Sequence, residues 1–85
     1  MFQLTHKGFT ITYANGITVS VQWGEGNYCE RRDKPDTSPH LMTSGSAEVL
    51  AWDKDRNDLE PAQGWIEADQ LPFLLEKYRT WDFKN

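Results

Sequence analysis

The stretch of sequence that decides the fold is FTITYANGITVSVQW, residues 9–23. Polar and apolar residues alternate on both sides of Ala14-Asn15-Gly16, which is typical of two half-buried strands joined by a tight turn. A two-residue Asn15-Gly16 turn would mix polar and apolar side chains on both faces. A three-residue turn with Gly16 left-handed in a bulge instead collects the large side chains on one face. The predicted cross-strand pairs are Phe9 with Val21, Ile11 with Val19, and Tyr13 with Ile17. The opposite, solvated face is predicted to carry Thr10, Thr12, Thr18, Ser20 and Gln22.

The chain after the hairpin adds strands and a helix. Residues 47–52, AEVLAW, are predicted to form a third strand, and residues 64–67 a short fourth one. Helix 70–80 is indicated by an apolar stripe at helical spacing, formed by Leu71, Leu74, Leu75 and Tyr78. Asp69 is its expected N-cap, and Pro72 falls in the first turn, where its missing N–H does no harm. The prediction is one α+β domain over residues 1–85, in which the C-terminal helix packs on one face of a three- to four-stranded antiparallel sheet.

Residues 24–46 break every periodic pattern and are predicted to form one long loop. Loops of this length inside compact domains are usually functional or disordered. Its first part, GEGNYCERR after Trp23, combines glycines, aromatic rings, an amide and two guanidinium groups. Rings and arginines together give apolar burial and directional hydrogen bonds, as binding hot spots do. The candidate binding residues are Trp23, Glu25, Asn27, Tyr28, Arg31 and Arg32.

Charge and composition exclude several classes of protein. Nine Lys and Arg residues against thirteen Asp and Glu residues give a net charge of −4, which disfavours generic nucleic-acid binding. Basic and acidic residues balance over residues 1–46, so the whole excess lies in residues 47–85. The single cysteine excludes an intramolecular disulfide and favours a reducing cytosol. Since the chain has no apolar run of about 20 residues and no leader-like start, we expect a cytoplasmic protein that does not bind membranes.

Catalysis, metals and cofactors find little support in the sequence. Cys29 would need a nearby histidine, His6 or His40, to act as a nucleophile, and a small buried thiol is the commoner role. Residues 53–58, DKDRND, resemble the start of a calcium loop but lack its glycine and its final glutamate, so an acidic turn is the better interpretation. Carboxylate pairs such as Glu60 with Glu67, or Asp69 with Glu76, have surface spacing without a cleft. We expect no enzyme, no bound metal and no cofactor.

The eleven aromatic residues divide into a structural and a functional group. Periodicity assigns Phe9, Tyr13, Trp23 and Tyr78 to the core, with Trp52 and Trp65 as further members and Phe73 beside the helix stripe. Tyr28, the edge of Trp23 and the tail residues Trp81 and Phe83 are left for recognition. For Trp81 and Phe83, packing over the end of the core is the alternative.

Three segments together resemble small bacteriophage and prophage proteins of unassigned activity: ITYANG at 11–16, VSVQWGEGNYC at 19–29 and AEVLAW at 47–52. In those proteins a hairpin leads into a Trp/Phe-Gly-x-Gly-Asn-Tyr-Cys segment. The resemblance implies an accessory protein that binds and blocks a host protein, such as a defence component, and it implies no catalytic residue.

Two functional hypotheses follow. The first is a non-catalytic inhibitor of a host protein, which binds through the sheet edge and residues 24–36. The second is a protein that sequesters a small nucleotide-like ligand between aromatic rings and Arg31 or Arg32. A pocket at a homo-oligomer interface would suit a domain too small to enclose such a ligand alone.

Overall fold

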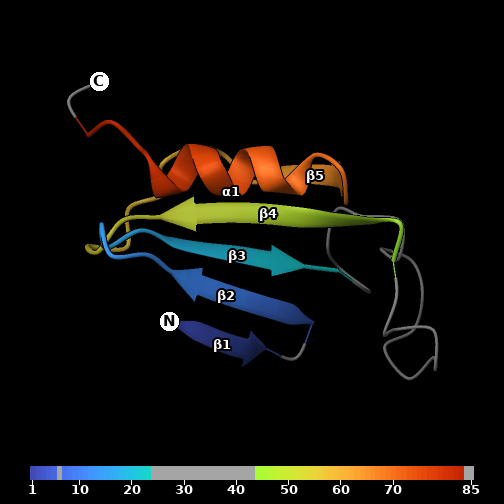
Figure 1. The fold of residues 1–85 in the computed structure, drawn as a ribbon. Helices are drawn as coiled ribbons and strands as arrows, with labels where there is room; N and C mark the ends of the chain where they lie inside the picture. Colours follow the sequence, from blue (N-terminus) through green and yellow to red (C-terminus); the bar gives the residue numbers. More distant parts are fainter. Residues whose placement is uncertain (6, 24–43, 84–85) are drawn as a thin grey trace.

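The computed structural model describes residues 1–5, 7–23 and 44–83. Within these ranges the chain forms a five-stranded antiparallel sheet in which each strand pairs with the next one along the chain, and one helix follows (Figure 1). The elements are β1 (Phe2–Thr5), β2 (Gly8–Thr12), β3 (Thr18–Gln22), β4 (Ser46–Trp52), β5 (Gln63–Glu67) and α1 (Leu71–Arg79). The predicted α+β class is confirmed, and the predicted three to four strands are corrected to five.

The predicted hairpin is confirmed as β2 and β3, in the predicted register. Phe9 lies opposite Val21, and Ile11 lies opposite Val19. The N–H of Tyr13 donates to the carbonyl oxygen of Ile17 at 2.9 Å, which closes the three-residue turn. Gly16 has a φ of 90°, in the left-handed region that glycine enters without steric cost.

The first strand, β1, was missed by the sequence analysis. Phe2 and Leu4 lie opposite Ile11 and Phe9, on the sheet face that carries the apolar residues of the hairpin. They are nevertheless 80% and 88% exposed. Four residues with two exposed apolar side chains give too short a periodic signal to identify a strand.

Two strands complete the sheet. The predicted strand 47–52 is confirmed as β4, which begins one residue earlier, at Ser46. The predicted loop 24–46 is therefore one residue shorter at this end, and its residues 24–43 lie outside the described part of the chain. The predicted short strand is confirmed as β5, which begins at Gln63.

A β-bulge separates Trp65 from the core. The pairs Ala47–Ile66 and Val49–Gln63 leave two residues of β5, Gly64 and Trp65, opposite one residue of β4. Trp65 has a φ of 58° and is 55% exposed. Its predicted place in the core is therefore wrong, because neighbouring strand residues point to opposite faces and Ile66 is the one that packs against the core.

The second face of the sheet is less open to solvent than predicted. Ser20 is buried, and its neighbours on this face are half-buried. Thr12 and Thr18 share a hydrogen bond of 2.9 Å between their Oγ1 atoms, and the Gln22 side-chain amide donates to Ser20 Oγ at 3.0 Å. Trp52 is half-buried on this same face, since it lies opposite Thr18. Its predicted place in the sheet–helix core is therefore corrected.

The helix lies within the predicted range 70–80. Its apolar stripe packs as predicted: Tyr78 is buried, and Leu71, Leu74 and Leu75 pack against the core. Asp69 is not the N-cap. That position belongs to Gln70, which makes no side-chain cap hydrogen bond, because its Oε1 accepts the N–H of Glu67 at 2.8 Å instead.

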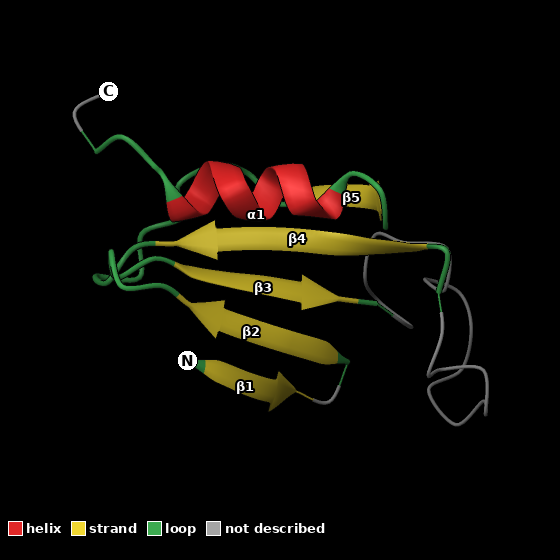
Figure 2. Cartoon of the chain, viewed as in Figure 1, coloured by secondary structure: helices red, strands yellow, loops and turns green. Residues whose placement is uncertain are grey.

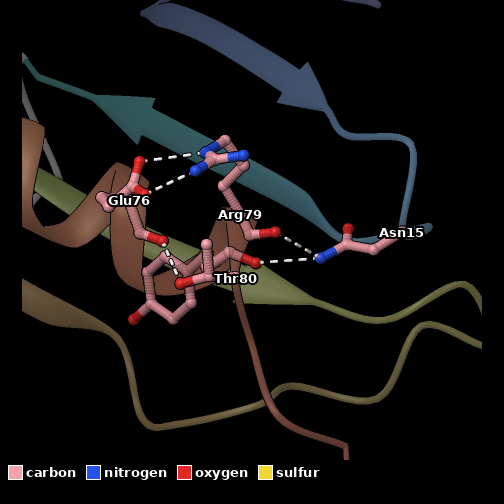
Figure 3. A network of polar contacts seen from close by, with 5 residues as sticks. Asn15, Glu76, Arg79 and Thr80 are labelled. Carbon is pink, nitrogen blue, oxygen red and sulfur yellow. Dashed lines mark hydrogen bonds and ion pairs between the residues drawn. The ribbon is translucent and has the colours of Figure 1, made fainter.

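The last turn of α1 is held by local polar contacts (Figure 3). The Arg79 guanidinium donates to both carboxylate oxygens of Glu76, at 2.9 and 2.6 Å. Thr80 Oγ1 donates to the Glu76 carbonyl oxygen at 2.8 Å. Basic residues at this end also complement the helix dipole.

The core lies between α1 and one face of the sheet. Figure 2 shows the helix along the part of the sheet that holds β4 and β5, with β1 at the far edge. The buried apolar residues are Ile17, Val19, Val21, Val49, Ala51 and Tyr78. Phe9, Tyr13 and Trp23 pack against this cluster, as predicted. Along the described residues, α1 included, there is no helix with the length and apolar character needed to cross a bilayer.

Candidate functional site

A cavity of about 340 Å³ opens between the sheet and the start of α1. Its apolar lining comes from every strand except β1, from the residue after β3 and from the first helical residue. These residues are Phe9, Val21, Trp23, Ala47, Ile66 and Leu71. Ser44, Gly45, Ser46, Glu67 and Ala68 complete the lining. A concave, mostly apolar surface of this size is the usual form of a binding site.

The sequence creates this hollow through register and side-chain size. Phe9 and Val21 face each other across β2 and β3, and Trp23 extends the same alternation by one step beyond β3. Ala47 lies opposite Ile66 and has only a methyl side chain. The next inward residue of β4, Val49, is larger and is fully buried in the core. Small residues at Gly45 and Ala47 therefore leave space that the larger side chains around them enclose.

The lining is weakly polar and carries a negative charge. Glu67 is the one charged side chain among the described residues that line the cavity. The hydroxyl of Ser44 donates to the Ser46 carbonyl oxygen at 2.6 Å, so it already has an acceptor. None of these lining residues is a histidine, a cysteine or a lysine. The lining is therefore suited to burying an apolar group.

The predicted binding residues relate to this cavity through Trp23. Trp23 lines it, and its backbone N–H donates to the Lys7 carbonyl oxygen at 2.8 Å. The other predicted residues, Glu25, Asn27, Tyr28, Arg31 and Arg32, lie outside the described residues, as do Cys29, His6 and His40. Trp23 and Ser44, the described residues on either side of segment 24–43, both line the cavity.

The acidic turn 53–58 is organised around its first carboxylate. Asp53 Oδ1 accepts the backbone N–H groups of Asp55 and Asn57, at 2.9 and 3.0 Å. The hydrogen bond from Asn57 is the main reason why the pKa of Asp53 lies below its ordinary value. In the described part of the chain no three His, Cys, Asp or Glu side chains gather in a way that could hold a metal ion. The turn is thus accounted for by its own backbone hydrogen bonds.

A polar cluster around Tyr78 was not predicted. The buried Tyr78 hydroxyl donates to Glu60 Oε1 at 2.9 Å and accepts from the Gln63 side-chain amide at 2.8 Å. Lys77 Nζ lies 2.8 Å from the same carboxylate oxygen. Burial, followed by the hydrogen bond to Glu60, raises the pKa of Tyr78 to about 12. Because every member has a partner, the cluster joins α1 to β5 and to the chain before it rather than offering a reactive group.

The two alternatives for the tail residues, core packing and exposure, apply to one residue each. Trp81 packs against the core, with its ring 5.9 Å from that of Tyr78, whereas Phe83 is 57% exposed. Phe73 is 79% exposed, in agreement with its predicted position beside the helix stripe rather than on it. Sequence reasoning missed the cavity because the pairing of Ala47 with Ile66 follows from tertiary structure and leaves no local signal.

Comparisons with family models, with curated proteins and with solved structures give no match to this chain. The resemblance to phage proteins therefore stays a prediction.

Proposed function

We propose that this protein is a non-catalytic binding protein whose cavity receives an apolar side chain of a protein partner. The observation that carries the proposal is the apolar cavity between Trp23 and Ile66, at which segment 24–43 begins and ends. Tyr28, Arg31 and Arg32, which lie outside the described residues, are the further candidates for contacts with the partner that the sequence indicates. The phage resemblance suggests the class of partner, a host defence protein that binding would block.

The size and lining of the cavity favour a side chain over a nucleotide. A volume of about 340 Å³ is at the lower end of the range for small-molecule sites and suits one aromatic or branched apolar side chain. Interface hot spots commonly consist of such an anchor in a desolvated pocket. Glu67 would oppose a phosphate group, since like charges at close range are unfavourable.

A nucleotide-like ligand is the second candidate, and it is favoured by one observation. Trp23, a ring on which a base could stack, lines the cavity and precedes Arg31 and Arg32 by few residues in the sequence. Isothermal calorimetry with cyclic and linear nucleotides tests it directly. Heat of binding that is lost in an Arg31→Ala/Arg32→Ala variant would support this candidate, and no heat at high micromolar concentration would reject it.

The cavity itself is tested with side-chain mimics. Indole and p-cresol, titrated into labelled protein, should shift the amide resonances of Val21, Ile66 and Leu71. Ala68 lines the cavity and is exposed, so Ala68→Trp should obstruct it without entering the core. The matched control is Ala62→Trp, at another exposed alanine outside the lining. Equal shifts in both variants would contradict binding in this cavity.

Co-purification from host lysate then tests for a protein partner. Wild type and Ala62→Trp should retain the same host protein, and Ala68→Trp should lose it. A Trp23/Tyr28/Arg31 triple-alanine variant extends the test to segment 24–43. Identical proteins retained by all four forms would show that this region is not the binding surface.

A further inference from the structure

The edge strand β1 presents an uncovered apolar surface. Phe2 and Leu4 are 80% and 88% exposed on the face that α1 covers elsewhere. Ile11, opposite Phe2, is half-buried. Paired, exposed apolar side chains at a sheet edge are rare in isolated proteins, because they invite association.

The backbone of β1 defines how a further strand could pair with it. Met1 and Thr12 exchange both of their backbone hydrogen bonds at 2.7 Å. Hydrogen-bonded pairs alternate along an antiparallel ladder, so Gln3 and Thr5 also bond to β2. The N–H and C=O groups of Phe2 and Leu4 therefore point away from β2, toward the open edge.

The charge distribution favours an identical strand as the partner. Among Asp, Glu, Lys and Arg, residues 1–23 contain only Lys7, and the β1 sequence FQLT has no charged side chain. The whole net charge of −4 lies in residues 47–85, which form β4, β5 and α1 at the other side of the sheet. Two copies that meet at β1 would keep their acidic halves apart.

The two sheet edges also differ in protection. The β5 edge has the Gly64-Trp65 bulge and ends at Glu67, and bulges and charges are common devices against strand addition. Neither device occurs in β1, which pairs with β2 over four consecutive residues without a register shift. The open edge of β1 is thus the one suited to strand pairing.

We propose that two copies of this chain associate through antiparallel pairing of their β1 strands about a two-fold axis at Gln3. This register places Phe2 opposite Leu4 of the second copy, and Leu4 opposite its Phe2. The backbone N–H and C=O groups of Phe2 and Leu4 in both copies then all form hydrogen bonds across the new strand pair. A two-fold axis at Phe2 or at Leu4 would pair only half of these groups. The apolar surfaces of the two copies become continuous, which joins the two sheets into one.

The contact is small, so the dimer is weak. A four-residue strand pair with two large apolar side chains from each copy falls below the size of standard stable interfaces. We expect a dissociation constant of about 10 µM or weaker. The association should change little with salt, because β1 has no charged side chain.

Sedimentation equilibrium of the full chain, from about 1 µM to about 1 mM, tests the dimer. Wild type should shift from monomer to dimer, and Leu4→Lys should weaken association at least tenfold. Phe73→Lys is the matched control, since Phe73 is similarly exposed but lies on α1. A monomer at the highest concentration, or equal weakening by both variants, would overturn the proposal. Far-ultraviolet circular dichroism verifies that each variant is folded.

Disulfide trapping tests the register independently. In a Cys29→Ser background, Gln3→Cys should give a covalent dimer on mild oxidation, because the two copies of residue 3 form a non-hydrogen-bonded pair with Cβ atoms about 4.5–5.5 Å apart. Thr5→Cys and Thr10→Cys lie on the same face but away from the axis, and should stay monomeric. Cross-linking of Thr5→Cys to the same extent, or none with Gln3→Cys, would overturn this register.

Discussion

The side-chain amide of Asn15 donates a hydrogen bond to the backbone carbonyl oxygen of Tyr78 at 3.1 Å, although 63 residues separate the two. The same Nδ2 atom also donates to the Arg79 carbonyl oxygen at 3.1 Å (Figure 3). Its Oδ1 accepts the N–H of Ile17 at 3.0 Å. The turn of the β2–β3 hairpin thus donates to two carbonyl groups in the last turn of α1; the carbonyl oxygen of Tyr78 also accepts the N–H of Trp81 at 3.3 Å.

Replacement of Asn15 should therefore loosen the helix end as well as the turn. We expect Asn15→Ala to lower the free energy of unfolding by about 1–2 kcal/mol, because it removes three hydrogen bonds, of which those with Tyr78 and Ile17 are partly buried. Asn15→Asp keeps the Oδ1 acceptor but loses the donor and adds a negative charge at the negative end of the helix dipole. Urea denaturation should show it at least as unstable as Asn15→Ala. Wild-type stability of Asn15→Asp would contradict the helix-capping role.

Gly8 is expected to tolerate no side chain. A Cβ atom at this position would collide with the carbonyl oxygen of Val21 in β3 and would lie 3.0 Å from the Gln22 Cα. These are backbone atoms of a paired strand, so the sheet itself would have to move. We expect Gly8→Ala to cost about 2 kcal/mol or more by urea denaturation. Gly16→Ala, where φ is unfavourable but the Lys54 Cβ is 3.5 Å away, should cost about 1 kcal/mol. The reverse order would contradict the close approach of β2 to β3.

Tyr78 should make stability fall at high pH. Its pKa is raised to about 12, so the folded state holds the phenolic proton more tightly than the unfolded state, whose tyrosines titrate near 10. The resulting stabilisation is fully present below pH 10 and is lost as the pH rises toward 12. Tyr78→Phe should remove this part of the pH dependence and lower stability at neutral pH by about 1–2 kcal/mol, since Glu60 and Gln63 lose a partner. Urea denaturation at several pH values measures both effects, and an unchanged alkaline slope would contradict the assignment.

Glu60 should make the stability of the fold decrease at low pH. The hydrogen bond from Lys77 is the main cause that holds the pKa of Glu60 below its ordinary value of 4.5. This stabilisation is therefore present above about pH 4.5 and is lost as the pH falls through the lower folded-state pKa. We expect Glu60→Gln to reduce stability at pH 7 and to flatten the acid limb of the stability curve. Asp53 and Glu76, whose pKa values are also lowered, should keep part of that limb, and a curve unchanged by Glu60→Gln would contradict its contribution.

The sequence could predict what depends on local periodicity. Phe9 faces Val21 as predicted, because alternation and turn length together leave one register that separates polar from apolar side chains. Leu71 and Tyr78 lie on the buried stripe of α1 for the same kind of reason. The cap at Gln70 was not predicted, because its side chain is engaged by the N–H of Glu67, a contact that depends on how β5 ends.

Structural features that depend on contacts between distant residues could not be predicted from the sequence. Asn15 was identified as a turn residue, but its hydrogen bond to Tyr78 requires the hairpin and the helix end to meet. The cavity at Trp23 required the pairing of Ala47 with Ile66. Trp65 was predicted in the core because exposing both Trp65 and Ile66 to water is costly, but only Ile66 packs against the core and Trp65 is 55% exposed.

That bulge gives a prediction of its own. Trp65 has a φ of 58°, a region that costs a residue with a Cβ atom roughly 1–2 kcal/mol and costs glycine little. Both Trp65→Ala and Trp65→Gly remove the half-exposed ring, so the comparison between them isolates the backbone. At a regular strand position alanine would be the more stable of the two by about 0.5–1 kcal/mol. Here we expect the order to reverse, with Trp65→Gly more stable than Trp65→Ala by about 1 kcal/mol in urea denaturation. If alanine were the more stable residue at this position, β5 would have to run without the left-handed backbone conformation at residue 65.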